Sequence, residues 1–188
     1  MPLMKAVISP LVVTLLVALQ AGCGFQLRGA PPVSDALQPL AVDCGSQIPD
    51  SLCRTLKEQL RLGEVALSDD GSARYRLKLS SFEQDRRASA ITSQAAAAEY
   101  TLRHSVDLEV VSDDNIPMVS KTRLTTSESY RYDETNVLAK QREEDALRQQ
   151  LSDRLAQQII FRLAPLSEAR INAIREDYNS ASNNAATP

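Results

Sequence analysis

The 188-residue sequence predicts a single α+β domain, in which two helices pack on one face of a four-stranded mixed sheet. Apolar residues make up 43% and charged residues 24% of the chain, as in a globular protein. Three stretches alternate apolar and polar residues, the period of a half-buried strand, and two others repeat apolar residues at helical spacing. With a short apolar run before them, their order along the chain is β-α-β-β-β-α, which describes a two-layer, single-domain sandwich.

The first strand and the first helix open the predicted domain. Residues 37–42 form the short apolar run that we assign to a strand. Leu52, Leu56 and Leu60 then recur every four residues, which places an apolar stripe along one side of a helix. Gly63 follows at the position where the end of a helix favours glycine.

Three strands follow, each with one apolar and one polar face. The apolar faces are expected to carry Tyr75, Leu77 and Leu79 in the first, Tyr100, Leu102, Val106, Leu108 and Val110 in the second, and Thr122, Leu124, Thr126, Tyr130 and Tyr132 in the third. Arg86 and Arg87, and the four-alanine run from Ala95 to Ala98, are assigned to the connection between the first and second of these strands. Because both helices are expected on one side of the sheet, its polar face is free to meet solvent or a large partner.

The last helix is predicted over residues 138–163, where the apolar spacing returns to 3.6 residues. A row at every fourth position consists of Leu147, Leu151, Leu155, Ile159 and Leu163. Such a helix is about 39 Å long, enough to lie across a whole sheet. Pro165 ends it, so the folded domain is expected at residues 37–165 and residues 166–188 are predicted to be a polar, disordered tail.

The N-terminus has the pattern of an export signal, which we assign to residues 1–22. Lys5 is the only charged residue before Arg28, and residues 6–19 are almost entirely apolar but too few to span a bilayer comfortably. Small residues then precede Cys23, which resembles the bacterial lipobox except that Gln20 stands where leucine is usual. The alternative is an ordinary secretory signal that leaves Cys23 unmodified.

Lipid attachment at Cys23 would make residues 23–36 a lipidated tether and hold the protein on a membrane without a protein span. Gly24 follows the cysteine in place of the aspartate that retains lipoproteins in the inner membrane, and this favours the outer membrane. The remaining cysteines, Cys44 and Cys53, would then lie in an oxidising compartment that permits a disulfide. A bridge over so short a loop stabilises by roughly 2.5–3 kcal/mol; the alternative is two buried free thiols.

The composition and the absence of known catalytic motifs argue against most enzyme classes. The net charge of −3 is unlike that of a general nucleic-acid binder, and a single histidine excludes zinc sites built on two. None of the six glycines forms a dinucleotide-binding, P-loop or hydrolase-elbow motif. We interpret His104, on the apolar face of a strand, as a core-edge histidine bonded to backbone or a tyrosine. We therefore expect no catalytic site, no metal and no cofactor other than the lipid.

Several short motifs, taken in order, resemble the LptE family of outer-membrane lipopolysaccharide-assembly lipoproteins. The N-terminal motif is Cys23-Gly24-Phe25-Gln26-Leu27-Arg28, which looks like the Cys-Gly-aromatic-x-Leu-Arg start of that family. The others are Leu60-Arg61-Leu62, Ala98-Glu99-Tyr100, Leu138-Ala139-Lys140 and the Ala156-Gln157-Gln158-Ile159-Ile160 run that leads to Leu163. Together they cover most of residues 23–163, and Cys44 and Cys53 are not part of the family pattern.

The resemblance implies a role without catalysis. Family members plug the large β-barrel LptD in a 1:1 complex, assist its folding, and with it insert lipopolysaccharide into the outer leaflet of the outer membrane. The protein would then sit on the periplasmic side of that membrane, within the barrel lumen. The competing hypotheses are a periplasmic lipid- or substrate-binding lipoprotein attached to a membrane transporter and, last, a hydrolase.

Lipopolysaccharide, the ligand that the resemblance implies, has phosphates that arginine and lysine recognise well. We expect Arg86 and Arg87 at a loop tip after the second strand. The other candidates are Lys121 and Arg123 on the polar face of the fourth strand, and Lys140 and Arg142 near the start of the last helix. For each of them the alternative is an ordinary solvated surface charge.

Overall fold

The computed structural model describes residues 33–69, 71–91, 93 and 97–185. Cys23, the predicted signal and most of the predicted tether therefore lie outside the described residues. Four strands form one sheet in the order of the chain: β1 (Leu40–Cys44), β2 (Tyr75–Ile91), β3 (Ala97–Ser112) and β4 (Pro117–Arg131). β1 runs parallel to β2 and the other pairs are antiparallel, so the sheet is mixed.

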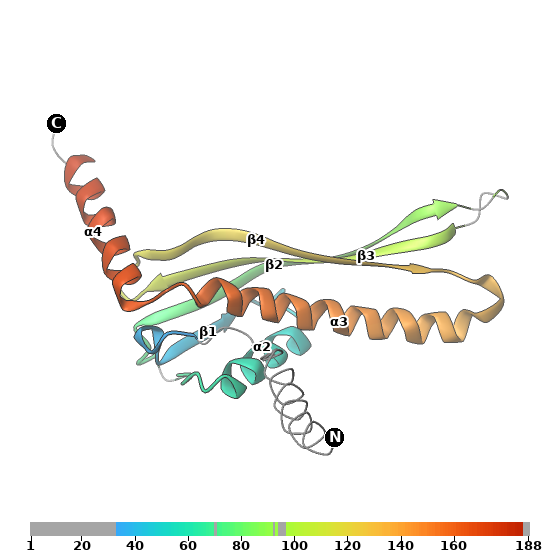
Figure 1. Cartoon of the computed structure of the whole chain (residues 1–188), viewed down its shortest axis with the longest axis horizontal. Coiled ribbons are helices and arrows are strands. Elements are labelled where there is room, and N and C mark those ends of the chain that lie inside the picture. Colours follow the sequence, from blue (N-terminus) through green and yellow to red (C-terminus); the bar gives the residue numbers. More distant parts are fainter. Residues whose placement is uncertain (1–32, 70, 92, 94–96, 186–188) are drawn as a thin grey trace, which may run out of the picture.

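Two helices, α2 (Asp50–Leu62) and α3 (Val137–Leu163), lie on the same side of this sheet (Figure 1). This confirms the predicted α+β class and the predicted order of elements. The apolar stripe of α2 is buried, as expected, and α3 buries its second half from Leu151 onward. Each leucine so buried stabilises the fold by roughly 1.5–3 kcal/mol relative to exposure.

The sheet has two unequal halves along its length. At one end, which we call the proximal end, β1 completes four strands, and α2, α3 and the sheet enclose the main core. Beyond Leu79, where β1 stops pairing, β2 and β3 continue as a long hairpin beside β4. This distal end has only a small apolar cluster of its own, in which Leu102, Tyr130 and Leu151 are buried.

The prediction that Arg86 and Arg87 lie in a connection was wrong, because β2 continues to Ile91 and β3 begins at Ala97. The register shifts between Ser80 and Glu83, where Ser81 has a φ of 53°. Such a bulge breaks the alternation of apolar and polar residues that identifies a strand in a sequence. The strand beyond it is also largely exposed, so its sequence has no apolar face to detect.

The prediction of a disordered tail was also wrong, since a third helix, α4 (Glu168–Ala185), follows α3. Ser167 Oγ accepts a hydrogen bond from the backbone N–H of Arg170 at 3.3 Å, the geometry of a helix N-cap. Leu166 and Ile171 are buried in the main core, and this anchors the first turns of α4. The sequence did not predict α4, because only its first turns carry buried apolar residues and its second half is polar. Within the described ranges, no helix is both long enough and apolar enough to cross a bilayer.

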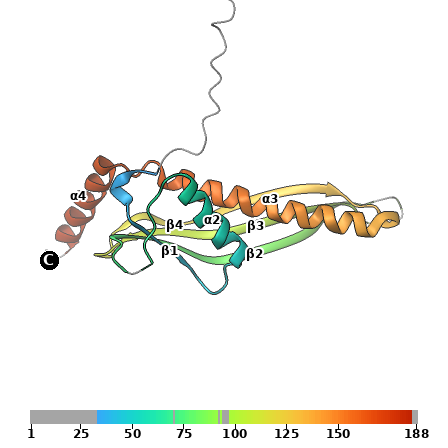
Figure 2. The ribbon, with the colours of Figure 1, turned by 90° about the horizontal axis from the view of Figure 1, so that it is seen from below.

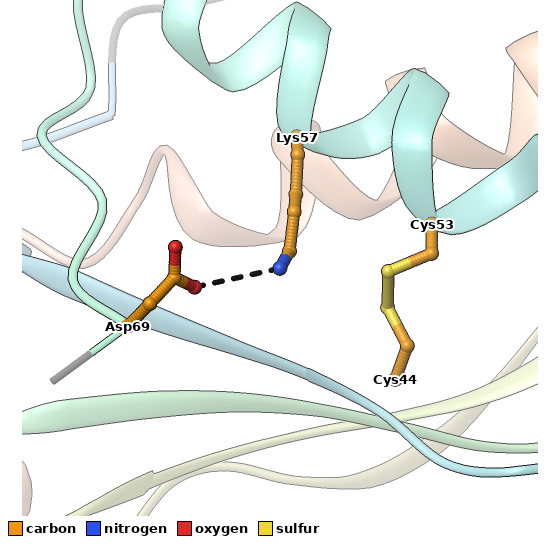
Figure 3. Close-up of a disulfide and its surroundings, with 4 residues drawn as sticks. All are labelled: Cys44, Cys53, Lys57 and Asp69. Atoms are coloured by element: carbon orange, nitrogen blue, oxygen red, sulfur yellow. Dashed lines mark ion pairs between the residues drawn. A yellow bond between two sulfur atoms is a disulfide. The ribbon is translucent and has the colours of Figure 1, made fainter. Parts of the chain in front are cut away.

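A disulfide joins the end of β1 to the first turn of α2 (Figure 3). Cys44 and Cys53 have an S–S distance of 2.02 Å and a Cα–Cα distance of 6.2 Å. Nearby, Lys57 on α2 pairs with Asp69 at 3.5 Å. The bridge therefore fixes α2 to the short edge strand of the sheet.

We predict that the double variant Cys44→Ser/Cys53→Ser loses about 2–4 kcal/mol of unfolding free energy, because its unfolded chain is no longer cross-linked. Urea unfolding of the full chain measures this. Dithiothreitol should lower the stability of the wild type by a similar amount and leave the double variant unchanged. Equal stability of the two proteins without reductant would contradict the prediction.

Candidate functional site

Arg86 lies on the helix-facing side of β2, opposite Leu102 of β3. Its guanidinium carbon is 3.6 Å from the ring centroid of Tyr100, a cation–π contact. Its Nε donates a hydrogen bond to the Tyr130 hydroxyl at 3.1 Å and lies 3.3 Å from a carboxylate oxygen of Glu144. The predicted loop tip is thus incorrect for Arg86, which is packed between the sheet and α3.

Arg87 points to the other side of the sheet, since neighbouring residues of a strand face opposite ways. It pairs with Asp85 at 2.6 Å, and its side chain is 75% exposed. The loop-tip prediction is wrong for this residue too. The two adjacent arginines therefore cannot bind one phosphate together.

Tyr130 and Glu144 extend the contacts of Arg86 to α3. The Tyr130 hydroxyl donates to Glu144, which also accepts from Arg148 one turn further along the helix. The Glu144 side chain is only 12% exposed. We call Arg86, Tyr100, Tyr130, Glu144 and Arg148 the distal network, because it ties the first half of α3 to the hairpin.

Charge and burial in the distal network keep Tyr130 protonated and Arg86 charged. Burial raises the pKa of Tyr130 to about 12, with a further contribution from its hydrogen bond to Glu144, so the hydroxyl stays a donor. Burial alone would lower the pKa of Arg86, but the hydrogen bond to Tyr130 and the charge of Glu144 outweigh it and raise that pKa. The network is therefore a charged and hydrogen-bonded unit at neutral pH.

Lys140 and Arg142 lie near the start of α3, at the same end of the molecule as the distal network. Lys140 pairs with Glu143 at 2.7 Å, whereas Arg142 has no ion pair within the described part of the chain. Val137 and Leu138, just before them, have exposed side chains. This end of α3 thus presents apolar and cationic side chains together.

Lys121 and Arg123 lie on the polar face of the sheet, away from α3. Both pair with Asp107 at 3.3 Å, and Arg123 also pairs with Glu83. Burial acts to raise the pKa of Asp107, but hydrogen bonds from Lys121 and Ser81 and the charges of both cations lower it overall. The six candidate cations therefore do not form one site: Arg86, Lys140 and Arg142 belong to the distal helix side, and Arg87, Lys121 and Arg123 to the opposite face.

His104 is buried on the helix-facing side of β3, with 2% of its surface exposed. Its Nδ1 is 3.5 Å from the Ser152 hydroxyl, and its ring meets the Phe82 ring edge-on. The expected backbone or tyrosine partner is thus replaced by a serine on α3. Burial, followed by the positive charge of Arg148, lowers the pKa of His104. No group of three metal-ligating side chains occurs among the described residues.

Comparison with solved structures places this architecture among small bacterial lipoproteins. The chain superposes on a minor lipoprotein of Acinetobacter baumannii with a TM-score of 0.56 and 26% identity, covering 67% of this chain and 90% of the other. A rare lipoprotein B from Shewanella oneidensis gives a TM-score of 0.60 at 22% identity, covering 71% and 97%. The second likeness shows the fold alone.

The sequence comparisons define the family within this class. Residues 37–163 match the LptE family, described as lipopolysaccharide-assembly. An LPS-assembly lipoprotein LptE of Pectobacterium atrosepticum is 30% identical over 161 residues, 84% of this chain and 85% of the relative. One from Yersinia enterocolitica is 29% identical, covering 89% and 80%. The chain belongs to the LptE family.

We predict that Arg86→Ala lowers the unfolding free energy by roughly 1–2 kcal/mol, because it removes the cation–π contact and leaves Glu144 with one cationic partner fewer. Arg87→Ala is the matched control and should change it by less than about 0.5 kcal/mol, since its ion pair is exposed. Urea unfolding measures both variants. Equal losses would show that Arg86 is an ordinary surface charge.

We predict a pH-dependent stability that originates at His104. Because its folded-state pKa lies below the usual histidine value of about 6.5, the unfolded chain binds the proton more readily, and stability falls as the pH drops below that value. Urea unfolding between pH 7 and pH 5 should show this slope in the wild type and a shallower one in His104→Gln. The same slope in both proteins would contradict the assignment.

Proposed function

We propose that this protein is a lipopolysaccharide-assembly lipoprotein of the outer membrane that plugs an LptD-type β-barrel in a 1:1 complex. It assists the assembly of that barrel and, with it, inserts lipopolysaccharide into the outer leaflet. The observation that carries this proposal is the family match over residues 37–163, which coincides with β1 through α3. The named relatives are themselves LPS-assembly lipoproteins.

The polar face of the sheet supports the role of a plug. The lumen of a membrane β-barrel is polar, and a surface that enters it must bring few unpaired charges. On this face Asp107 is shared by Lys121 and Arg123, Arg87 pairs with Asp85, and hydroxyl groups such as those of Thr101 and Ser129 bond to each other at 2.8 Å. These named charges and hydroxyl groups are therefore already paired within the sheet before the face meets a partner.

The distal helix side supports contact with an acylated, phosphorylated ligand. Arg142 and Lys140 offer cations for phosphate, and exposed Val137 and Leu138 offer apolar contact for acyl chains. Arg86 acts indirectly, because it holds the helix that presents these groups. Arg87, Lys121 and Arg123 keep their acidic partners on the other face of the sheet, and Lys140 pairs with Glu143 at 2.7 Å. We therefore assign the main phosphate contact to Arg142, with Lys140 beside it as a second cation.

Attachment to the membrane is assigned to lipid on Cys23. Each buried methylene of an acyl chain contributes about 0.8 kcal/mol, so several chains on one cysteine hold a protein firmly at a bilayer. Gly24, which follows Cys23, favours release to the outer membrane. The protein then works as a membrane-anchored binding protein, and we assign it no catalytic step.

The experiment that tests the proposed partner is an affinity pull-down of the tagged full chain from detergent-extracted envelopes, followed by mass spectrometry. The expected companion is one very large outer-membrane β-barrel in equimolar amount. Recovery of inner-membrane transporter subunits in its place would overturn the proposal in favour of a lipid- or substrate-binding lipoprotein. Cys23→Ala, which cannot be lipidated, tests whether anchoring is needed for the interaction.

A further inference from the structure

A polar hollow of about 560 Å³ lies at the proximal end, where α4 meets the start of β2 and the 3-10 helix η2 (Asp35–Leu37). Figures 1 and 2 both show η2, in blue, and the base of α4, in dark red, at this end. The hollow is lined by Asp35, Arg74, Tyr75, Glu168, Ile171 and Arg175, among others. α4 lies beyond the residues that match the LptE family, so the hollow depends on a helix outside the matched region.

The hollow brings unsatisfied groups of both charges together. Among the described residues, the side chains of Arg74 and Glu168 have neither an ion pair nor a hydrogen bond. Arg175 binds Asp114 through Nη1 at 2.5 Å, and a further hydrogen bond with Tyr75 helps to raise its pKa, so its guanidinium is already held in place within the lining of the hollow.

We propose that this hollow binds the phosphoethanolamine headgroup of a membrane phospholipid. Guanidinium groups recognise phosphate oxygens, so Arg74 and Arg175 contact the phosphate. The Glu168 carboxylate accepts hydrogen bonds from the ammonium group, and Ile171 contacts the methylenes between the two charges. A zwitterionic ligand suits this hollow, because the lining places one free cation, Arg74, and one free anion, Glu168, around the same space.

The position of the hollow brings it within reach of a bilayer. Ser34 lines it and is only eleven residues from Cys23, so at most about 40 Å of chain separates the two. The argument that the hollow is held near a bilayer rests on the lipid attachment at Cys23 proposed above. The recognition chemistry does not, since a soluble lipid can reach the hollow without an anchor.

The test is calorimetric titration of the full chain, held in amphipol, with dihexanoylphosphatidylethanolamine below its micelle-forming concentration. We expect saturable binding at one site, at least fivefold tighter than dihexanoylphosphatidylglycerol, which lacks the ammonium group. Arg74→Gln and Glu168→Gln should each weaken binding about tenfold. The matched control Arg170→Gln removes an exposed charge from the same helix outside the hollow and should leave binding unchanged.

Each remaining result would overturn the proposal. Absence of saturable binding excludes a headgroup site, and equal binding of inorganic phosphate shows a simple anion site. Equal weakening by Arg170→Gln shows a nonspecific charge effect.

Thermal unfolding of each variant, unchanged from the wild type, ensures that α4 remains folded. Barrel recovery in the pull-down is a separate readout, so this inference and the proposed function can fail independently.

Discussion

The constraint on which the distal half of this molecule depends is the placement of a permanent cation between sheet and helix. Arg86 faces α3 from β2 with its side chain 37% exposed, and it lies against the Glu144 carboxylate, which is only 12% exposed and would be costly to leave unpaired. Tyr100, Tyr130 and Glu144 supply the partners that make this position favourable. Because Glu144 comes from the helix, satisfying the arginine also fixes the first half of α3 on the hairpin.

The proximal and distal ends of the molecule are stabilised by different kinds of interaction. At the proximal end, apolar burial between α2, α3 and the sheet dominates, and a disulfide adds a covalent link. At the distal end few apolar side chains are buried, and polar and aromatic contacts replace them. Because α3 runs through both halves, the apolar core at the proximal end positions the more polar distal end, which is where we assign ligand contact.

The sequence predicted the elements whose periodicity is not interrupted. The four-residue leucine spacing of α2 and the alternation from Tyr100 to Val110 reflect burial on one face, so these elements were found. The second half of β2 was missed because a bulge at Ser81 shifts the alternation and most of its side chains are exposed. α4 was missed because only Ile171 and a few neighbours are buried, and its N-cap at Ser167 is identified only from the structure.

The candidate site was only partly predictable from the sequence, because the contacts that define it join residues far apart along the chain. Cationic residues can be found in a sequence, but their partners lie far away along the chain. Arg86 meets Glu144 across the sandwich, and Lys121 meets Asp107 across two strands. Only the fold separates cations that pair internally from those, such as Arg142, that have no ion pair within the described residues.

The central claim, that the distal end of α3 is the ligand-contacting part, is tested most directly by lipopolysaccharide binding to the full chain. Surface plasmon resonance would compare Lys140→Glu/Arg142→Glu with Arg61→Glu/Arg162→Glu, which makes the same charge change on exposed helix positions at the proximal end. The account predicts at least fivefold weaker binding for the distal pair and less than twofold for the proximal pair. Equal weakening by both pairs would contradict it, because overall charge would then explain the binding.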